Sequence, residues 1–302
     1  MSKFATDVDK ICKKIKCCEA EIKILTDEEA ERKAVLKKQI KYHTAKMKIV
    51  TSNKNKGEKA EVLLLLRLYH LNELEKFDKL IEIFGEEASE GIAILNLATD
   101  DEISDIDKLS KAPSGYKADC KIKMKKTKTV YSISIKSKHG ANPAILNHTH
   151  RKAKIFQEGG ILYDYLPCLD TILQEYIYKR ANKIICEDIS ITSLMCLNDD
   201  HSLKEKFIEV LTYFVFDGSG KGYSKCNANA IITYDDKITF MRCNSIQDKK
   251  TYIESIYDKI VISLRNKAMP KSIPEYCKPW IFDDIKPDDS VKRKGSLHIR
   301  IK

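Results

Sequence analysis

Apolar residues in the first fifty positions recur at the three- and four-residue spacing of a helix face. One such series runs over residues 11–25 and a second over residues 36–50. The intervening "LTDEEAE" contains residues that favour a turn and a helix start. We therefore predict a helical hairpin over residues 1–50, followed by a second domain over residues 51–302.

Residues 119–137 follow a different pattern, because apolar and polar side chains alternate along them. The alternation runs through "DCKIKM" and again through "TVYSISIKS", and "KKTK" lies between the two runs. A period of two places alternate side chains on opposite faces of a strand. The segment is thus predicted to form a β-hairpin.

The rest of the chain combines both patterns. Residues 153–215 carry tyrosine and isoleucine at helical spacing. Three further strands joined by turns are predicted from "YFVFDGSGKGYSKCNANAIITYDDKITFMRC", and a last strand from "SLHIRIK". The order of helix, sheet, helix and sheet favours an α/β or α+β body.

Composition narrows the protein class. The hydrophobic fraction of 43% supports a folded core. The ten cysteines include no C-x-x-C pair, which argues against a zinc ribbon and a disulfide framework. The sequence has neither an apolar run long enough to span a bilayer nor an apolar signal core at its start, so we expect a cytoplasmic protein without membrane contact.

Positive charge is concentrated in one part of the chain. The whole sequence carries a net charge of +10, and the segment Tyr116–Lys154 holds eleven basic residues against the single acid Asp119. Such a concentration favours a polyanionic partner, and nucleic acid is the first candidate. A lysine-rich, solvated surface is the alternative. The helical hairpin, also rich in lysine, is interpreted either as a structural pair or as a DNA clamp or dimer arm.

Asp119 begins one strand of the predicted β-hairpin, and Ser134 and Lys136 share one face of the other strand. Neighbouring strands lie about 4.8 Å apart, so these side chains can meet at one edge of the sheet. A carboxylate there can bind Mg²⁺, and a lysine can stabilise charge that develops on a phosphoryl group. The chemistry suited to this pairing is phosphodiester hydrolysis.

One carboxylate makes a poor magnesium site, so a second acid is expected. The simplest position for this second acid is residue 134, but the chain has a serine there. Glu58 and Glu61 share a face near the start of an apolar helix and are the main candidates, although acids at a helix N-terminus are also favoured by the helix dipole. Glu158 is a weaker candidate.

Six blocks in this order resemble the HpaII-type restriction endonucleases of the PD-(D/E)xK nuclease superfamily: "NKGEKAE", "SGYKADCKI", "SISIKSKHGANPAILNHT", "FDGSGKGYSKCNANAIIT", "AMPKS" and "LHIRIK". The resemblance implies a mixed central sheet flanked by helices. It also implies that Asp119 and Lys136 are catalytic, with Ser134 at the usual acid position and Glu61, in preference to Glu58, joining Asp119 as a metal ligand. Lys59 stands where the family usually has an aromatic residue.

The same resemblance implies a Mg²⁺-dependent type II restriction endonuclease that cuts double-stranded DNA at a short site. A cognate DNA methyltransferase would be its functional partner without direct contact. Cutting both strands of a palindrome requires a homodimer or sequential action by a monomer. The alternatives are a strand-specific nicking enzyme, a non-catalytic DNA-binding protein on the same fold, and an RNA-binding basic protein.

Three segments supply candidate DNA contacts. Asparagine can pair with adenine and arginine with guanine, and lysine can contact phosphates. The glycine-rich "DGSGKGYSKCNANA" lacks the spacing of a P-loop, so we interpret it as a turn or a groove-binding loop. The predicted DNA-binding residues are Lys138, His139, Asn142, Asn147, His148, Arg151, Lys221, Tyr223, Lys225, Asn227 and Lys271.

Overall fold

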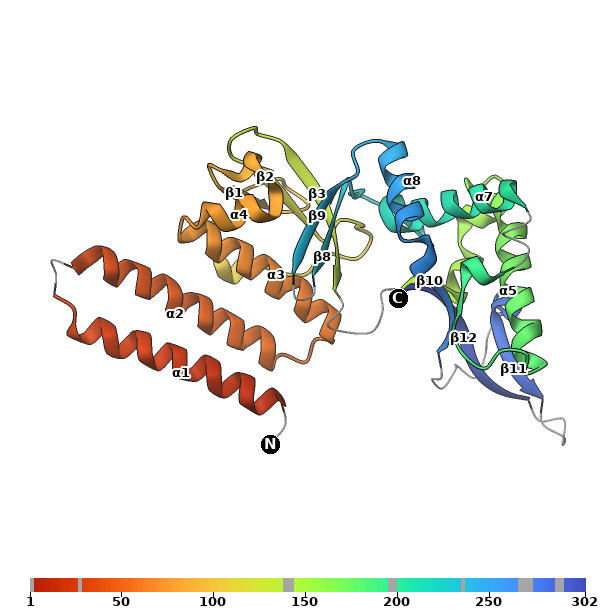
Figure 1. Ribbon diagram of the computed structural model, residues 1–302, viewed down its shortest axis with the longest axis horizontal. Helices are drawn as coiled ribbons and strands as arrows, with labels where there is room; N and C mark the ends of the chain where they lie inside the picture. Colours follow the sequence, from red (N-terminus) through yellow and green to blue (C-terminus); the bar gives the residue numbers. More distant parts are fainter. Residues whose placement is uncertain are drawn as a thin grey trace. The chain divides into compact units, whose positions relative to one another are not determined.

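A computed structural model gives the fold of the chain (Figure 1). It describes residues 3–26, 29–137, 144–194, 200–234, 237–265, 274–285 and 291–302. The chain forms two compact units. The first unit comprises Met1–Pro113, Ala118–Ala141 and Ala230–Met241, and the second comprises Ser114–Lys117, Asn142–Asn229 and Arg242–Lys302.

The first unit begins with the predicted helical hairpin, which the structure confirms. Its described helices are α1 (Lys3–Ile24), α2 (Ala30–Thr51), α3 (Lys56–Glu73) and α4 (Phe77–Phe84). In Figure 1, α1 and α2 lie side by side and α2 runs next to α3. The hairpin and the following sheet belong to one compact unit. The boundary between the two units therefore does not fall at residue 50, where the predicted ranges 1–50 and 51–302 meet.

A mixed five-stranded sheet completes the first unit, in the order β1-β2-β3-β8-β9. Its strands are β1 (Ile92–Leu95), β2 (Cys120–Met124), β3 (Val130–Ser137), β8 (Ala230–Tyr234) and β9 (Ile238–Arg242). The antiparallel pair β2 and β3 confirms the predicted β-hairpin. Because β3 pairs with β8 in parallel, the sheet is mixed, and the predicted α+β class is confirmed at that level.

Helix α3 is apolar on two faces, and each face is buried. Leu64 and Leu68, both fully buried, belong to the core cluster that includes Ile122 and Ile133 of the sheet. Leu66 instead packs with Ala45 of α2. A helix that is apolar on most sides needs neighbours on most sides. Burying one leucine contributes roughly 1.5–3 kcal/mol, so this packing fixes α3, and with it the acids at its start, against the sheet.

The second unit contains an antiparallel sheet in the order β11-β12-β10-β5, with β4 also paired to β12. Its strands are β4 (Ala144–Asn147), β5 (Ile189–Ser190), β10 (Ile260–Arg265), β11 (Ile281–Ile285) and β12 (Val291–Ile301). Its described helices of two turns or more are α5 (Leu166–Ala181), α7 (His201–Thr212) and α8 (Ile246–Ser255). A separate small hairpin joins β6 (Gly218–Ser219) to β7 (Gly222–Tyr223).

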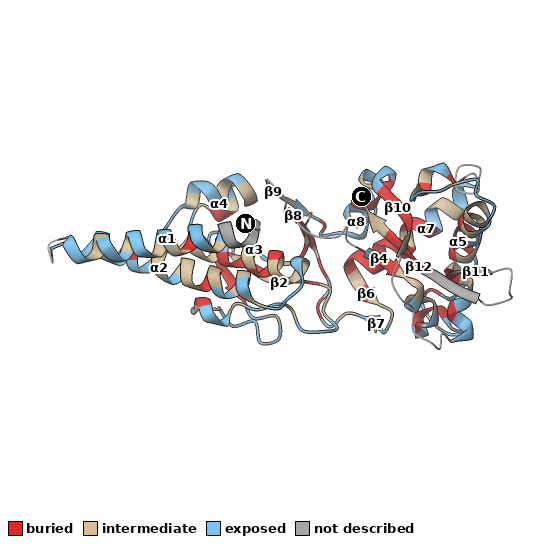
Figure 2. Cartoon of the chain, turned by 90° about the horizontal axis from the view of Figure 1, so that it is seen from below, coloured by how far each residue is buried: buried red, intermediate tan, exposed pale blue. Residues whose placement is uncertain are grey.

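One predicted strand of this unit is wrong. Residues Tyr213–Asp217, read as the start of a strand, form a π-helical turn that continues α7. Its aromatic side chains Phe214 and Phe216 are almost fully buried. In the same unit, Figure 2 shows buried residues in red along β10. Continuous burial suits either a buried strand or a buried helix, so the apolar run itself could not decide between them.

Within the described residues, no helix combines the length and the apolar character that a membrane crossing requires.

Candidate active site

Asp119 lies immediately before β2 and is fixed to the neighbouring strand β3. Its backbone N–H donates to the carbonyl oxygen of Ile133 over 2.7 Å. Its carboxylate oxygen Oδ2 accepts from the backbone N–H of Ile135 over 2.6 Å and from the hydroxyl of Ser134 over 3.3 Å. The pairing of β2 with β3 therefore brings Asp119 beside Ser134, as the alternation predicted.

Lys136 joins the same group. Ser134 and Lys136 are two residues apart on β3, so their side chains lie on one face. The Lys136 ammonium donates to Ser134 Oγ over 2.9 Å. Ser134 is only 2% exposed, so its hydroxyl connects the ammonium to the Asp119 carboxylate away from bulk water. A buried link of this kind restricts the positions of both charged groups.

The two candidate glutamates of α3 have different surroundings. Asn55 caps the helix by accepting from the backbone N–H of Glu58 over 2.9 Å. The Glu58 side chain forms an ion pair with Lys111, and this hydrogen bond lowers the pKa of Glu58. The negative charge of Glu58 is therefore already balanced by the ammonium group of Lys111.

Glu61, almost one turn further along, lies within electrostatic reach of the β-hairpin. Its pKa is raised to about 7, mainly by burial and then by the negative charge of Asp119, while Lys111 and Lys136 oppose the shift. The carboxyls of Asp119 and Glu61 thus repel each other in a partly desolvated place. This geometry supports Glu61 over Glu58 as the second acid.

Lys111 is a neighbour of the site that the sequence did not single out. It lines a small hollow with Asp119, Leu65 and Cys120. It also pairs with Glu58 and influences the charge of Glu61. Lys111 lies in an irregular loop without periodicity, and its only sequence signal was a lysine near a turn-forming "APSG".

The donor set fits a hard divalent cation. Within the described part of the chain, no group of three or more histidine, cysteine, aspartate or glutamate side chains is placed to hold a metal ion. Asp119 and Glu61 nevertheless provide two carboxylates, and Mg²⁺ is typically bound by one or two carboxylates together with water and substrate phosphates. A cation between these carboxylates would relieve the repulsion that raises the pKa of Glu61.

The remaining predicted site residues belong to the second unit or fall outside the described residues. Lys138, His139, Asn142 and Lys271 lie outside them. Glu158, the weaker acid candidate, is an exposed residue of the second unit. The predicted groove-binding residues Lys221, Tyr223, Lys225 and Asn227 are exposed on or just after the β6–β7 hairpin.

Two predicted DNA contacts, Asn147 and Arg151, make internal hydrogen bonds, and a third, His148, is half-buried. Asn147 caps the short helix His148–Lys152 by accepting from the backbone N–H of Thr149 over 2.9 Å. His148 is half-buried, and burial lowers its pKa. Whether Asn147 and His148 contact DNA stays a prediction.

Arg151 is engaged by the protein. Its guanidinium donates to both carboxylate oxygens of Asp170, each over 2.9 Å, and to the carbonyl oxygen of Tyr276. Trp280 also donates to Asp170, over 2.8 Å. This arrangement assigns Arg151 a structural role in the second unit, and its predicted contact with guanine remains a prediction.

No family model, curated protein or solved structure matches the chain significantly.

Proposed function

We propose that this chain is a Mg²⁺-dependent type II restriction endonuclease that hydrolyses phosphodiester bonds of double-stranded DNA at a short site. The observation that carries the proposal is the connected group Lys136–Ser134–Asp119 with Glu61 beside it. The six sequence blocks that resemble HpaII-type enzymes add support, because the same residues occupy the blocks and the group.

The architecture of the first unit is compatible with a PD-(D/E)xK core. The acid begins one strand and the lysine lies on the adjacent strand of a mixed sheet, with a helix packed against it. Ser134 replaces the usual second acid of the strand, and Glu61 on α3 supplies a carboxylate in its place. The positive charge of the segment 116–154 supports a polyanionic substrate.

Each residue of the group has a role that follows from its contacts. Asp119 and Glu61 would hold Mg²⁺, which, when bound, supplies polarisation of the scissile phosphoryl oxygen and activation of a water molecule. Lys136 would stabilise the negative charge that develops on the phosphoryl oxygens. Ser134 would hold Lys136 and Asp119 at a fixed separation by its two hydrogen bonds.

Plasmid digestion tests the proposal. The full chain is incubated with supercoiled plasmid in Mg²⁺ and, in parallel, in excess chelator, and the ends are sequenced. The proposal expects metal-dependent linear fragments with one fixed end sequence. Open circles alone would identify a nicking enzyme, and unchanged plasmid together with tight DNA binding would identify a non-catalytic DNA-binding protein. The same end mapping provides the recognition sequence, and the dependence of rate on enzyme concentration separates a homodimer from a monomer.

A further inference from the structure

The second unit contains a cavity of about 560 Å³ whose lining is basic. Lys152, Lys154 and Lys221 line it, and none of the described lining residues is acidic. No carboxylate among the described residues pairs with these three ammonium groups. Lys152 is partly engaged, because its ammonium lies 5.8 Å from the centre of the Tyr276 ring. The positive charge of these three lysines is therefore not neutralised by a carboxylate of the described residues.

Its walls are held together by specific contacts. A side chain at Gly220 would approach the His150 ring to 2.8 Å, so only glycine lets the tip of the β6–β7 hairpin lie against this histidine. Behind the tip, the backbone N–H of Lys225 donates to the carbonyl oxygen of Gly115 over 3.1 Å. The three chain segments that form the cavity, residues 114–115, 149–154 and 219–221, are thus fixed by packing and by hydrogen bonding.

His150 provides a neutral hydrogen-bond donor in this wall. Its Nδ1 accepts from the backbone N–H of Asn147 over 2.9 Å. Because a neutral imidazole carries one proton, that proton is then on Nε2. Burial, with a smaller effect from Lys117, lowers the pKa of His150 to about 4, so the ring is neutral at physiological pH.

A hollow of mixed apolar and polar lining adjoins the cavity. Lys154 lines both, and the hollow is also lined by Ile161, Tyr223 and the carboxylate-bearing Glu158. The Tyr223 side chain is 66% exposed, and its ring is steadied by an edge contact with Tyr213 at 5.5 Å between centres. An exposed aromatic ring beside a basic groove is the arrangement on which proteins stack nucleic-acid bases.

We propose that this cavity and the adjoining hollow form a nucleotide subsite, with the phosphate at Lys154, Lys221 and His150 and the base against Tyr223. The volume supports a whole nucleotide in preference to a lone phosphate, because cavities of about 300–1,000 Å³ accommodate ligands of small-molecule size. The ligand chemistry is that of a nucleotide phosphate, either free or within a DNA strand. The DNA source rests on the proposed function, whereas the subsite itself does not.

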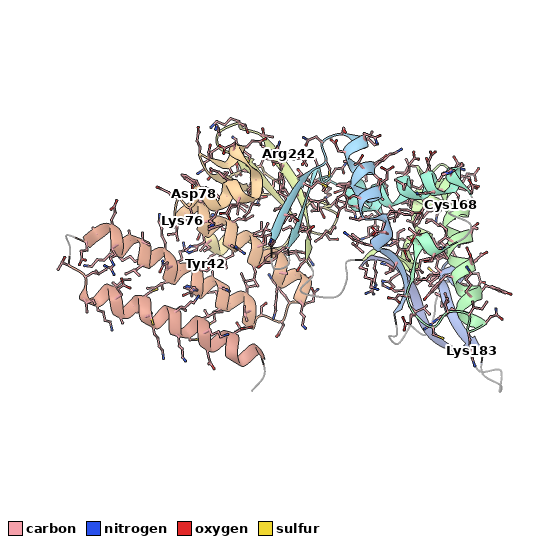
Figure 3. All side chains as sticks on the ribbon, in the orientation of Figure 1. Tyr42, Lys76, Asp78, Cys168, Lys183 and Arg242 are labelled. Atoms are coloured by element: carbon pink, nitrogen blue, oxygen red, sulfur yellow. The ribbon has the colours of Figure 1, made fainter. Side chains whose placement is uncertain are left out.

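Equilibrium binding to the full chain in excess chelator tests the subsite without hydrolysis. The probes are inorganic phosphate, a deoxynucleoside monophosphate, a labelled single-stranded oligonucleotide and a labelled duplex. The variants are Lys154→Ala/Lys221→Ala and Tyr223→Ala. The matched control is Lys183→Ala/Lys206→Ala, which removes two exposed lysines elsewhere in the second unit; Lys183 is labelled in Figure 3.

The subsite predicts that the cavity double variant loses about ten-fold in affinity for a nucleotide ligand, while the control retains it. Loss for the monophosphate identifies a free nucleotide as a ligand. Loss for the oligonucleotides, with a salt dependence shallower by about 0.9 per lysine for the duplex and about 0.7 per lysine for the single strand, identifies a DNA strand. Tyr223→Ala should weaken binding of the oligonucleotide and of the monophosphate, but not of inorganic phosphate.

Equal binding by the cavity variant and the control for all four probes would overturn the subsite, and so would a wild-type chain that binds none of them. Plasmid digestion is scored separately. A chain that binds nucleotides through Lys154 and Lys221 but cuts no DNA would contradict the proposed nuclease function alone.

Discussion

The ammonium of Lys136 donates to the hydroxyl of Ser134 over 2.9 Å, and the same hydroxyl donates to Asp119 over 3.3 Å. A serine thus stands between the two charged groups that a metal-dependent nuclease needs. Its position in the interior, 2% exposed, means that water does not readily replace the hydroxyl. In the proposed site, Ser134 would therefore position the two charged groups and would not bind the metal.

Ser134→Ala removes both hydrogen bonds and leaves both charges. Because a hydrogen bond to a charged group contributes about 1.5–3 kcal/mol, we expect the cleavage rate to fall about ten-fold while the Mg²⁺ requirement changes little. Single-turnover cleavage across a Mg²⁺ titration measures both quantities. Ser89→Ala, in the same unit, is the control. A large rise in the Mg²⁺ requirement would show that Ser134 holds the metal instead.

Glu61→Gln keeps the size of the side chain and removes its charge. If Glu61 completes the metal site, this variant cleaves slower by orders of magnitude and needs more Mg²⁺, since one carboxylate is lost. Glu58→Gln breaks the ion pair with Lys111 and should have a smaller effect. Parallel Mg²⁺ titrations of Glu58→Gln, Glu61→Gln and Glu158→Gln decide the matter. Normal cleavage by Glu61→Gln, with either other variant inactive, would identify a different acid.

The raised pKa of Glu61 should also make the stability of the protein depend on pH. Its pKa is about 7 in the folded protein and near 4.5 in the unfolded chain, so between these values the folded state binds more protons. Stability contributed by this group is therefore present at low pH and is lost as the pH rises from 4.5 through 7. Melting temperatures of wild type and Glu61→Gln, without divalent metal, should differ more at pH 8 than at pH 5, with the variant relatively more stable at pH 8.

Mg²⁺ provides the complementary check, because a bound cation favours the charged form of Glu61. Addition of Mg²⁺ at pH 8 should raise the melting temperature of the wild type more than that of Glu61→Gln. A pH profile that is identical for the two proteins would show that the pKa of Glu61 is not raised, and an equal response of both to Mg²⁺ would show that Glu61 does not hold the cation.

Much of this site was predictable because it depends on local pattern. The alternation along residues 119–137 fixes the strand pairing, and that pairing places Asp119 beside Ser134 and Lys136. The spacing of Glu58 and Glu61 places both on one face of α3, but it cannot show that Lys111 neutralises one of them. That distinction depends on an irregular loop whose course has no sequence period.

Other features depend on contacts between distant segments. The parallel pairing of β8 with β3 returns residues 230–234 to the first sheet, across most of the second unit in sequence, and no local pattern encodes that return. Arg151 was read as a DNA contact because arginine often is one, whereas Asp170 engages it through the folding of the second unit. The aromatic run at residues 213–217 fits a strand or a helix equally, and continuation of α7 decided it.

Substitution of either member of the Arg151–Asp170 ion pair should lower the stability of the protein. Both side chains are mostly buried, at 17% and 20% exposed, and they form two parallel hydrogen bonds. Arg151→Lys keeps the positive charge but cannot form both parallel hydrogen bonds, and it should lower stability by roughly 2 kcal/mol. Asp170→Asn should do the same, and the double variant should lose less than the sum.

Thermal melts measure these losses, and DNA binding well below the melting temperature separates stability from recognition. Unchanged affinity of folded Arg151→Lys is expected. A stable variant with much weaker or less specific DNA binding would support the prediction that Arg151 contacts a base.

Cleavage of plasmid DNA by Asp119→Asn tests most directly whether Asp119 and Lys136 form a catalytic site. Its matched controls are Asp78→Asn, which alters an exposed acid of α4, and Lys76→Ala beside it, compared with Lys136→Ala; Figure 3 labels both control positions. All variants are assayed in Mg²⁺ for cleavage and in chelator for DNA binding. If these residues are catalytic, Asp119→Asn and Lys136→Ala bind DNA but do not cut it, while both controls cut at the wild-type rate. Cleavage by Asp119→Asn at the wild-type rate would show that Asp119 is not a catalytic residue.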